Sequence, residues 1–252
     1  MLLLFDIGNT HTHVGLASSS KVIRQTNIPT AEWSERTAEA KLHAFVGDKK
    51  IDGVSVGSVV PKATPHILKA ASSYGNFPTV ILTHKSAKGV GIKYPQPASI
   101  GADRLANAIA ASHYYPSPVV VVAFGTAVAF DIIDRDKNYI GGIIAPGLSA
   151  MTDYLHEKTA LLPRIKIRDV KSVVGKSTEQ AMLIGAVHGY RGLIRELIHE
   201  LKLELKARKL PVIATGGYAA LMAKGMKEIT EVSPSLTLEG LRLNWLGNQK
   251  QP

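Results

Sequence analysis

A short polar turn directly follows the first apolar run of the chain. Residues 2–5 have the composition of a buried strand, and Asp6 ends that run. A carboxylate at a strand end can hold magnesium or its water, and Gly8 lets backbone amides approach a phosphate. Asn9 and Thr10 offer neutral hydrogen bonds to phosphate oxygens. The same sequence also suits an ordinary turn between two strands, so this motif gains weight only if similar turns occur elsewhere.

Two further glycine turns do follow apolar runs. A Gly-Thr-Ala sequence at 125–127 comes after four consecutive valines, and Thr-Gly-Gly at 215–217 comes after residues 211–214. The second of these precedes a helical pattern, where a helix N-terminus can accept a nucleotide. Segments 3–10 and 120–127 align with Ala123 opposite Asp6, an offset of 117 residues and close to half the chain. Three such turns, two of them at aligned positions, favour phosphate binding over three unrelated turns.

A different kind of candidate opens a helical pattern at Gly101-Ala102-Asp103-Arg104. Aspartate favours a helix N-terminus, so a structural role alone would explain this sequence. The functional interpretation is a general base, Asp103, beside an anion-binding Arg104, whose guanidinium forms a fork that fits a carboxylate. His11 and His13 would face the same side of a strand, but no third ligand lies near them in the sequence, which disfavours a metal site.

The composition excludes several other classes of protein. The 252 residues include no cysteine, which rules out disulfides, thiolate zinc sites and a cysteine nucleophile. No Gly-x-Ser-x-Gly sequence occurs, and Gly175-Lys176-Ser177 lacks the earlier glycine and the leading strand of a P-loop. No basic leader precedes the first apolar run, and no run approaches the roughly 18 apolar residues of a membrane span. We therefore expect a soluble, cytoplasmic protein that makes no membrane contact.

The formal charge of +10 raises the question of nucleic-acid binding. Eleven basic and five acidic side chains lie between Arg164 and Lys209, where apolar residues keep helical spacing, so the charges are expected on a solvated helix face. Aromatic residues make up 6% and are not interleaved with the basic run, so nucleic acid is not an expected partner. A positive balance also suits anionic small molecules such as nucleotides.

The spacing of apolar, glycine and proline residues predicts two α/β series. The first has strands at residues 2–5, 12–17, 21–25, 53–60 and 79–82, helices at 30–45 and 65–73, and a loop at 88–100. The second has strands at 118–123, 128–133, 139–144, 211–214 and 229–232, and helices at 102–113, 151–158, 177–209 and 238–245. A capping box opens the long helix at Ser177. Similar element order and the aligned turns predict a duplication, with halves at 1–100 and 101–252.

Taken together, these sequences resemble the type III pantothenate kinase family. Each match is short, but they occur in the family's order along nearly the whole chain and are jointly specific. They are Asp6-x-Gly-Asn-Thr, Ser58-Val-Val-Pro61, Tyr94-Pro-Gln-Pro97, Gly101-x-Asp-Arg, Gly125-Thr-Ala, Gly141-Gly-x-x-x-Pro-Gly147, Leu162-Pro163, Ser177-Thr178, Thr215-Gly-Gly and Leu236-Thr-Leu-Glu-Gly-Leu241.

The resemblance implies an α/β fold of two duplicated actin- and hexokinase-like halves, each with a ribonuclease-H-type core, and an interdomain cleft. It implies a homodimer that uses ATP and magnesium to phosphorylate pantothenate, the first step of coenzyme A biosynthesis. Asp103 would be the catalytic base, and Tyr94, Gly101, Arg104 and the partner's Thr178 would bind pantothenate. ATP would be bound by Asp6, which also holds the metal, and by Gly8, Asn9, Thr10, Gly125, Thr126, Gly216 and Gly217.

One position departs from the family pattern. Ala123 stands where the family has an aspartate at the second phosphate loop, and Ala129 replaces a threonine, whereas Asp131 is kept. The missing carboxylate removes the expected ligand for a monovalent cation, K⁺ or NH₄⁺. Three alternatives follow: a weak kinase, a kinase that uses another ion ligand, or a non-catalytic relative with a binding or regulatory role. A kinase of another small hydroxy acid is a further alternative, and retained Asp6 and Asp103 favour catalysis.

Overall fold

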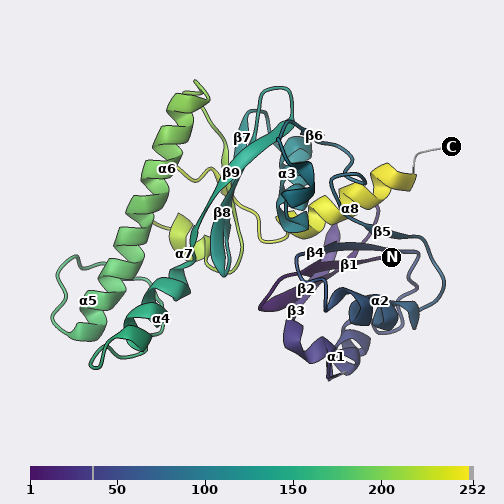
Figure 1. Cartoon of the computed structure of the whole chain (residues 1–252), viewed down its shortest axis with the longest axis horizontal. Helices are drawn as coiled ribbons and strands as arrows, with labels where there is room; N and C mark the ends of the chain where they lie inside the picture. The colour runs from purple at the N-terminus through teal and green to yellow at the C-terminus, as the bar shows by residue number, and fades with distance from the viewer. Residues whose placement is uncertain (36, 250–252) are drawn as a thin grey trace. The chain divides into compact units, whose positions relative to one another are not determined.

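The computed structural model of the chain describes residues 1–35 and 37–249. The chain forms two compact units (Figure 1). Unit 1 contains residues 1–115, 136–140 and 235–252, and unit 2 contains residues 116–135 and 141–234. The boundary expected at residue 100 lies inside unit 1, because the helix that starts with Ala102 and the last helix of the chain both belong to this unit.

Unit 1 is built on a five-stranded sheet with the order β3-β2-β1-β4-β5. Its strands are β1 (Leu2–Ile7), β2 (His11–Ala17), β3 (Val22–Pro29), β4 (Gly53–Ser58) and β5 (Thr79–Ile81). Strands β1, β2 and β3 pair antiparallel, whereas β4 runs parallel to β1 and β5 parallel to β4. The parallel strands therefore end at one edge of the sheet, where Asp6 lies.

The second sheet has the order β11-β10-β7-β8-β9-β6. Its strands are β6 (Gly91–Ile92), β7 (Val119–Phe124), β8 (Ala127–Ile133), β9 (Asn138–Pro146), β10 (Val212–Thr215) and β11 (Glu231–Val232). Strand β7 pairs antiparallel with β8 and parallel with β10. The first residues of β9, Asn138 and Tyr139, belong to unit 1, where β6 pairs parallel with them.

The two sheets confirm the predicted duplication. The order β3-β2-β1-β4-β5 is repeated as β9-β8-β7-β10-β11, with β6 added at the edge. Asp6 and Ala123 are each the second-last residue of the first strand, so the alignment of the turns is structurally correct. The turn after the strand is one residue shorter in unit 2, which places Ala123 opposite Ala129 where Asp6 lies opposite His13.

The helices agree with most of the predicted ranges. They are η1 (Thr30–Trp33), α1 (Thr37–Val46), α2 (Thr64–Ser72), η2 (Pro97–Ser99), α3 (Ala102–Tyr114), α4 (Leu148–Lys158), α5 (Thr178–Ile184), η3 (Gly185–Gly189), α6 (Tyr190–Glu204), α7 (Ala219–Ala223) and α8 (Leu236–Gln249). No helix among residues 1–35 and 37–249 is long and apolar enough to cross a membrane.

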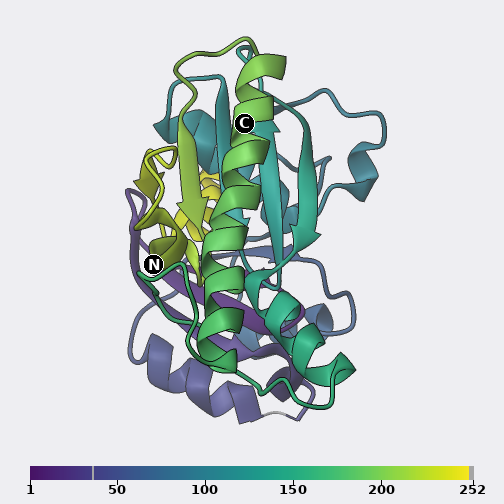
Figure 2. The same cartoon turned by 90° about the vertical axis from the view of Figure 1, so that its left-hand side faces the viewer.

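Two predicted helices differ in detail from the structure. The helix expected at 30–45 is a short 3-10 turn followed by α1, and Arg36 lies outside the described residues. The long helix expected from Ser177 is interrupted by a π-helical turn, η3, between α5 and α6. Its predicted cap is correct, because Ser177 Oγ accepts a hydrogen bond from the Gln180 backbone N–H at 3.2 Å. Figure 2 shows α6 running along one face of the unit 2 sheet.

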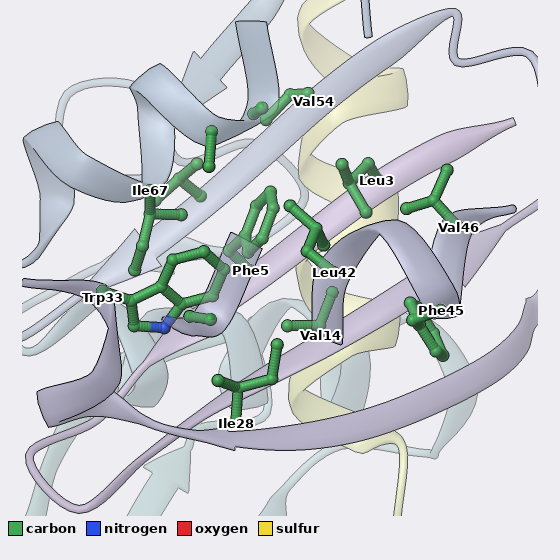
Figure 3. Packing of buried hydrophobic residues seen from close by; sticks show 14 of the residues in the cluster. Leu3, Phe5, Val14, Ile28, Trp33, Leu42, Phe45, Val46, Val54 and Ile67 are labelled. Carbon is green, nitrogen blue, oxygen red and sulfur yellow. The ribbon is translucent and has the colours of Figure 1, made fainter. Parts of the chain in front are cut away.

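The core of unit 1 follows from the alternation of β1. Leu3, Phe5 and Ile7 point to one face, where side chains from α1 and α2 join them in a single buried cluster (Figure 3). The other residues of β1 therefore point to the opposite face, because successive strand residues alternate. A Cβ on Gly15, the cross-strand partner of Leu4, would lie 3.1 Å from Leu238 of α8, so α8 covers this second face.

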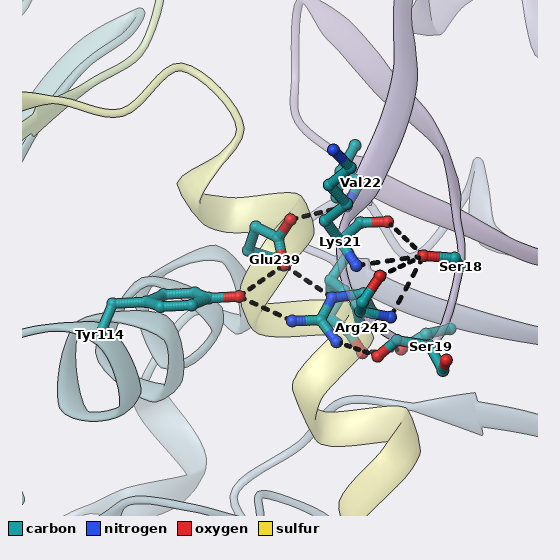
Figure 4. Close-up of polar contacts among 10 residues, drawn as sticks. Ser18, Ser19, Lys21, Val22, Tyr114, Glu239 and Arg242 are labelled. Carbon is teal, nitrogen blue, oxygen red and sulfur yellow. Dashed lines mark hydrogen bonds and ion pairs between the residues drawn. The ribbon is translucent and has the colours of Figure 1, made fainter.

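Helices α3 and α8 pack closely on that face. A Cβ on Gly240 of α8 would collide with the Ala106 carbonyl oxygen of α3, so only glycine permits this approach. A buried polar network also ties the two helices to the β2–β3 hairpin (Figure 4). Glu239 accepts hydrogen bonds from Arg242 Nε at 2.6 Å, from the Tyr114 hydroxyl at 2.9 Å and from the Val22 backbone N–H at 2.6 Å. These contacts fix the C-terminal end of α3.

We expect the substitution Arg242→Met to destabilise unit 1 strongly. Arg242 is 3% exposed and Glu239 is 9% exposed, so the substitution leaves a buried carboxylate without its cation. Breaking a buried pair in this way typically costs about 3–5 kcal/mol of unfolding free energy. Urea unfolding measures the loss. The matched control is Lys41→Met, which breaks the exposed Lys41–Glu32 pair and should cost less than about 1 kcal/mol. Equal losses in the two variants would contradict this account of the network.

Candidate active site

Asp6 lies at the carboxyl end of β1, on the face that α3 and α8 cover. Its neighbour across the parallel ladder is Gly57 of β4. A Cβ on Gly57 would lie 3.1 Å from Leu241 Cδ2 and 3.5 Å from Ala102 Cβ. The missing side chain at position 57 therefore lets the first turn of α3 approach the end of β1. This close approach brings Asp103, the second residue of α3, into electrostatic contact with Asp6.

Both carboxylates are in a buried environment that raises their pKa values. Burial and the charge of Asp103 raise the pKa of Asp6 from 3.8 to about 7. Burial also raises the pKa of Asp103, although the backbone N–H and the guanidinium of Arg104 act in the opposite direction. Asp103 Oδ1 is buried and has no hydrogen-bond partner among the residues that the structure describes. Buried acceptors are normally satisfied, so this atom indicates a place for a ligand.

Gly101 leaves room for the Asp103 carboxylate. It is the N-cap residue of α3, and a Cβ at this position would collide with Asp103 Oδ1. Gly101 therefore acts by its lack of a side chain, which keeps the carboxylate in its present orientation at the helix start. Because an α-helix N-terminus has unsatisfied backbone N–H groups, the same position also favours negative charge.

The first phosphate-loop candidate, residues 8–10, is held by the segment after β3. The Gly8 backbone N–H donates to the His11 carbonyl at 3.0 Å, which closes the turn. The Thr30 hydroxyl donates to the Gly8 carbonyl at 2.6 Å, and the Thr30 backbone N–H donates to the Thr10 carbonyl at 3.0 Å. Asn9 and Thr10 are exposed. The loop is therefore fixed through its carbonyl groups, while its polar side chains face outward.

Three side chains of unit 1 form a second part of the candidate site. The Tyr94 and Tyr139 rings meet edge to face with centroids 5.9 Å apart. Arg104 Cζ lies 5.6 Å from the Tyr139 centroid, within the range of a cation–π interaction. Arg104 follows Asp103 in α3, and β6 brings Tyr94 to Tyr139 by pairing with β9. The Arg104 guanidinium thus acts on the Asp103 carboxylate and also faces the Tyr139 ring, against which the half-buried Tyr94 phenol packs.

The residues at the end of β1 fit a magnesium ion. Two nearby carboxylates, one with a pKa raised partly by the other, have an electrostatic cost that a divalent cation would relieve. Among the described residues, no group of three or more His, Asp or Glu side chains could hold a metal without other ligands. Mg²⁺ commonly takes only one or two protein carboxylates and completes its shell with water and phosphate oxygens. Asp6 is therefore suited to a metal–phosphate group.

Unit 2 presents two glycine turns at the carboxyl ends of its parallel strands. The Gly125 N–H donates to the Ala127 carbonyl at 3.0 Å, as Gly8 does to His11 in unit 1. The Gly147 N–H donates to the Thr126 carbonyl at 3.1 Å, and a Cβ on Gly147 would collide with that carbonyl. Gly147 therefore supports the 125–126 turn by close backbone contact. Gly125 and Thr126 are both exposed.

The Gly216-Gly217 turn requires glycine at its first position. Gly216 has a φ of +90°, and a Cβ there would collide with the Phe124 carbonyl oxygen. The turn leads into α7, and the Tyr218 hydroxyl is hydrogen-bonded to Ser149 Oγ at 2.7 Å. Both glycines are exposed beside the N-terminus of a helix. This part of unit 2 can accept a flat or anionic group against bare backbone.

Ala123 occupies the position that corresponds to Asp6. Its cross-strand neighbours are Ala129 of β8 and Thr215 of β10. The side chain at position 123 offers no oxygen, so it does not fit the role of a cation ligand. Asp131 lies two positions further along β8 than Ala129, on the same face, and is fully buried.

Thr178 is the first residue of α5 and is exposed on unit 2. Its position at a helix N-terminus follows from the Ser177 cap. The structure thus places the predicted residues in two groups: Asp6, Gly8, Asn9, Thr10, Tyr94, Gly101, Asp103 and Arg104 in unit 1, and Gly125, Thr126, Thr178, Gly216 and Gly217 in unit 2.

Sequence reasoning missed three residues that shape these groups. Tyr139 lies in an ordinary strand pattern. Its contact with Tyr94 depends on a parallel pairing between residues 47 positions apart, which no local signal reveals. In the sequence, Gly57 looks like any small residue in a strand. Gly147 was noted only as part of a longer motif, although two glycines and a proline so close together are a signal of close backbone packing.

Comparison with solved structures shows an actin-like fold of the kind that the motifs imply. A Campylobacter jejuni protein described as belonging to the Baf family of transcriptional activators has a TM-score of 0.62 at 18% identity, covering 99% of this chain and 100% of that one. MreB 5 of Spiroplasma citri, bound to AMPPNP, has a TM-score of 0.50 at 11% identity, covering 99% and 97%. These likenesses confirm the predicted fold.

The sequence comparisons identify the family. The family model for type III pantothenate kinase matches residues 2–200. A type III pantothenate kinase from Akkermansia muciniphila is 45% identical over 242 residues, which cover 96% of both chains. Another, from Finegoldia magna, is 37% identical over 251 residues and also covers 96% of both. The chain therefore belongs to the type III pantothenate kinase family, as its motifs predicted.

We expect the raised pKa of Asp6 to appear as a pH dependence of stability in magnesium-free buffer. A carboxyl group with a folded-state pKa of about 7 and an ordinary value of 3.8 binds its proton more tightly when folded. Its stabilising contribution is complete below about pH 4 and is lost as the pH rises through 7. Between pH 5 and 8.5, the free energy of unfolding of the wild type should fall by on the order of a few kcal/mol relative to that of Asp6→Asn.

Urea unfolding at several pH values measures this difference. Asp48→Asn removes an exposed carboxylate from the same unit and serves as the control, which should follow the wild type. Added magnesium chloride should restore part of the wild-type stability at high pH but not that of Asp6→Asn. Parallel pH curves for the wild type and Asp6→Asn would show that Asp6 has an ordinary pKa.

Proposed function

We propose that this chain is an ATP-dependent kinase that converts pantothenate to 4′-phosphopantothenate, the first step of coenzyme A biosynthesis, in the cytoplasm. Family membership supports the substrate and the reaction. The structural observation that carries the proposal is the buried, unpartnered Oδ1 of Asp103 beside Arg104 at the start of α3. A substrate hydroxyl could donate a hydrogen bond to this carboxylate oxygen.

Asp103 is proposed to act as the general base. Burial raises its pKa, which improves its ability to accept a proton near neutral pH. The substrate hydroxyl would donate a hydrogen bond to the carboxylate. As the oxygen attacks the γ-phosphorus of ATP, the proton would pass to Asp103, the bond from the γ-phosphorus to the β,γ-bridging oxygen would break, and ADP would leave. Arg104 is proposed to bind the carboxylate of pantothenate, because its guanidinium is oriented by the Tyr139 ring. Tyr94 and Gly101 would complete this binding surface.

Asp6 is proposed to hold magnesium, which would neutralise charge on the phosphates during transfer. The loop at Gly8, Asn9 and Thr10 would orient phosphate oxygens in unit 1. In unit 2, Gly125 and Thr126 are proposed to contact phosphates, and Gly216 and Gly217 are proposed to lie against the adenosine. Phosphoryl transfer depends mainly on positioning and charge neutralisation, so these elements are sufficient for the chemistry.

A monovalent cation held at position 123 does not form part of this proposal. The methyl group of Ala123 supplies no ligand for K⁺ or NH₄⁺, which prefer oxygen. Its ladder neighbours are Ala129, which also lacks a side-chain oxygen, and Thr215, which the family pattern already contains, so neither supplies a carboxylate in its place. We propose that the enzyme turns over without a cation at this position.

A homodimer is proposed, with Thr178 reaching the partner's pantothenate. Large apolar side chains are exposed on unit 2 in and around the segment that leads to α5, and Leu161 is 90% exposed. The others are Ile144, Met151, Tyr154, Leu155, Val173, Val174 and Leu203. Exposed apolar groups concentrated on one part of a chain are typical of a protein interface.

Pantothenate-dependent release of ADP tests the proposed reaction directly. Purified protein with magnesium and ATP should release ADP when pantothenate is added, and other small hydroxy acids should give far lower rates. A rate that does not change on adding pantothenate would favour a binding or regulatory role. A faster rate with another hydroxy acid would favour a different kinase of the same fold.

The substitution Asp103→Asn should lower the rate of phosphorylation by about 10²–10⁴-fold, because the amide cannot accept the proton. Pantothenate binding, measured by calorimetry, should remain within a few-fold of the wild type. The control Asp48→Asn should leave both quantities unchanged. A variant that retains a rate within a few-fold of the wild type would exclude Asp103 as the base.

The substitutions Leu161→Glu and Val173→Glu, made together, should convert the proposed dimer to a monomer, because they place two charges among exposed apolar groups of unit 2. Light scattering measures the mass in solution. Ile23→Glu changes an exposed aliphatic residue of unit 1, 52% exposed, and should leave the dimer intact. A wild-type protein that is monomeric at the same concentration would contradict the proposed dimer.

A further inference from the structure

A cavity of about 500 Å³ lies in unit 2 at the edge of the sheet where the parallel strands begin. Pro118 precedes β7, Pro211 precedes β10 and Thr230 precedes β11, and all three line it. The glycine turns at 125–126 and 216–217 follow the other ends of β7 and β10. Strand β7 has six residues, and a strand rises about 3.3 Å per residue. The cavity is therefore separated from these turns by the length of a strand.

Four cationic side chains line this cavity. Lys202 belongs to the last turn of α6, Arg208 and Lys209 lie between α6 and β10, and Lys227 follows α7. Among the residues that the structure describes, none of these four side chains has an ion pair or a side-chain hydrogen bond. The Lys202 side chain is half-buried.

The acid in the lining, Glu228, pairs with none of these four cations among the described residues, and its buried Oε2 has no hydrogen-bond partner there. Glu228 Oε1 accepts a hydrogen bond from Arg195 Nε at 3.2 Å, and Arg195 lies outside this cavity. A neighbouring cavity of about 510 Å³ provides the contrast, because Arg195 pairs there with Glu228, and Lys224 pairs with Asp169 at 3.1 Å. Two cations of the neighbouring cavity are thus paired, whereas the four cations of the first cavity, including Lys227, which lines both, have no ion pair among the described residues.

Four unpaired positive charges around one concave surface create a local potential that attracts anions. A neutral donor is also present, because Ser117 lines the cavity and its Oγ is buried without a hydrogen-bond partner among the described residues. Pro116, Pro118, Leu210 and Pro211 supply apolar wall. The volume lies in the range of small-molecule sites. No aromatic residue lines the cavity, so it lacks the stacking surface typical of single-stranded nucleic-acid sites.

We propose that this cavity is a second anion site, which binds a small molecule carrying two or more phosphate groups. The cations would pair with phosphate oxygens, the Ser117 hydroxyl would donate a hydrogen bond, and the proline and leucine side chains would cover an apolar part of the ligand. The site is distinct from the proposed ATP-binding turns and does not depend on the kinase function.

Calorimetry with inorganic tripolyphosphate tests the proposal on the full chain. Tripolyphosphate is titrated into the protein with and without saturating magnesium and ATP. The bound ATP prevents tripolyphosphate from binding at the nucleotide site. The affinity for tripolyphosphate measured in the presence of ATP should fall at least tenfold in the double variant Lys202→Gln and Lys227→Gln. The control pair Lys49→Gln and Lys85→Gln removes the same charge from exposed positions of unit 1 and should change the affinity less than twofold. Basal kinase activity should be unchanged in both pairs.

A second measurement does not depend on variants. Hydrogen exchange of the wild type should slow at residues 210–212 when tripolyphosphate is added in the presence of ATP. Three results would overturn the proposal: no binding once ATP is present, equal weakening in the two lysine pairs, or tighter binding of oligonucleotides as their length increases. The last result would show an extended nucleic-acid surface instead of a small-molecule site.

Discussion

The proximity of two buried carboxylates, Asp6 and Asp103, is the constraint on which the rest of unit 1 depends. Burial and, to a smaller extent, the charge of Asp103 raise the pKa of Asp6 to about 7, so the fold holds an arrangement that is unfavourable without a ligand. Packing elsewhere must maintain it. Gly57 admits the start of α3, Gly240 lets α8 lie directly on α3, and the Glu239 network fixes the other end of α3. Perturbed carboxylates held in this way are typical of functional sites, and a cation with phosphate would relieve the strain.

The duplicated units have kept one backbone plan and changed its chemistry. Both have the same sheet order, and both close the turn after their first strand with a glycine N–H bonded to a carbonyl, at 3.0 Å in each case. In unit 1, this backbone arrangement carries two acidic side chains, Asp6 at the end of β1 and Asp103 on α3. Unit 2 has alanine in the position of Asp6 and instead exposes bare backbone at Gly125, Gly216 and Gly217. A metal–phosphate role therefore suits the first unit, and recognition by backbone groups suits the second.

Much of this organisation could be predicted because its signals are local. The apolar runs that end in glycine turns fixed the strands and the duplication, and the Ser177 cap marked the start of α5 correctly. Two kinds of feature could not be predicted. Tyr139 reaches Tyr94 only because β6 pairs with β9, and register between distant segments is not encoded in either segment alone. The π-helical turn at 185–189 interrupts a regular apolar pattern, and the spacing of apolar residues gives no sign of it.

The effect of the net charge of +10 depends on where the cationic side chains lie. A positive balance suits nucleotide binding. However, Lys202, Arg208, Lys209 and Lys227, which have no ion pair among the described residues, lie where β7 and β10 begin, and the glycine turns lie where these strands end. A six-residue strand spans roughly 17 Å between its first and last residues, which exceeds the Debye length of about 8 Å at physiological salt. These cations therefore contribute little to the potential at the turns. Phosphate binding at the turns, as proposed above, would therefore depend on backbone N–H groups and a metal, and the proposed anion of the basic cavity would be a separate ligand.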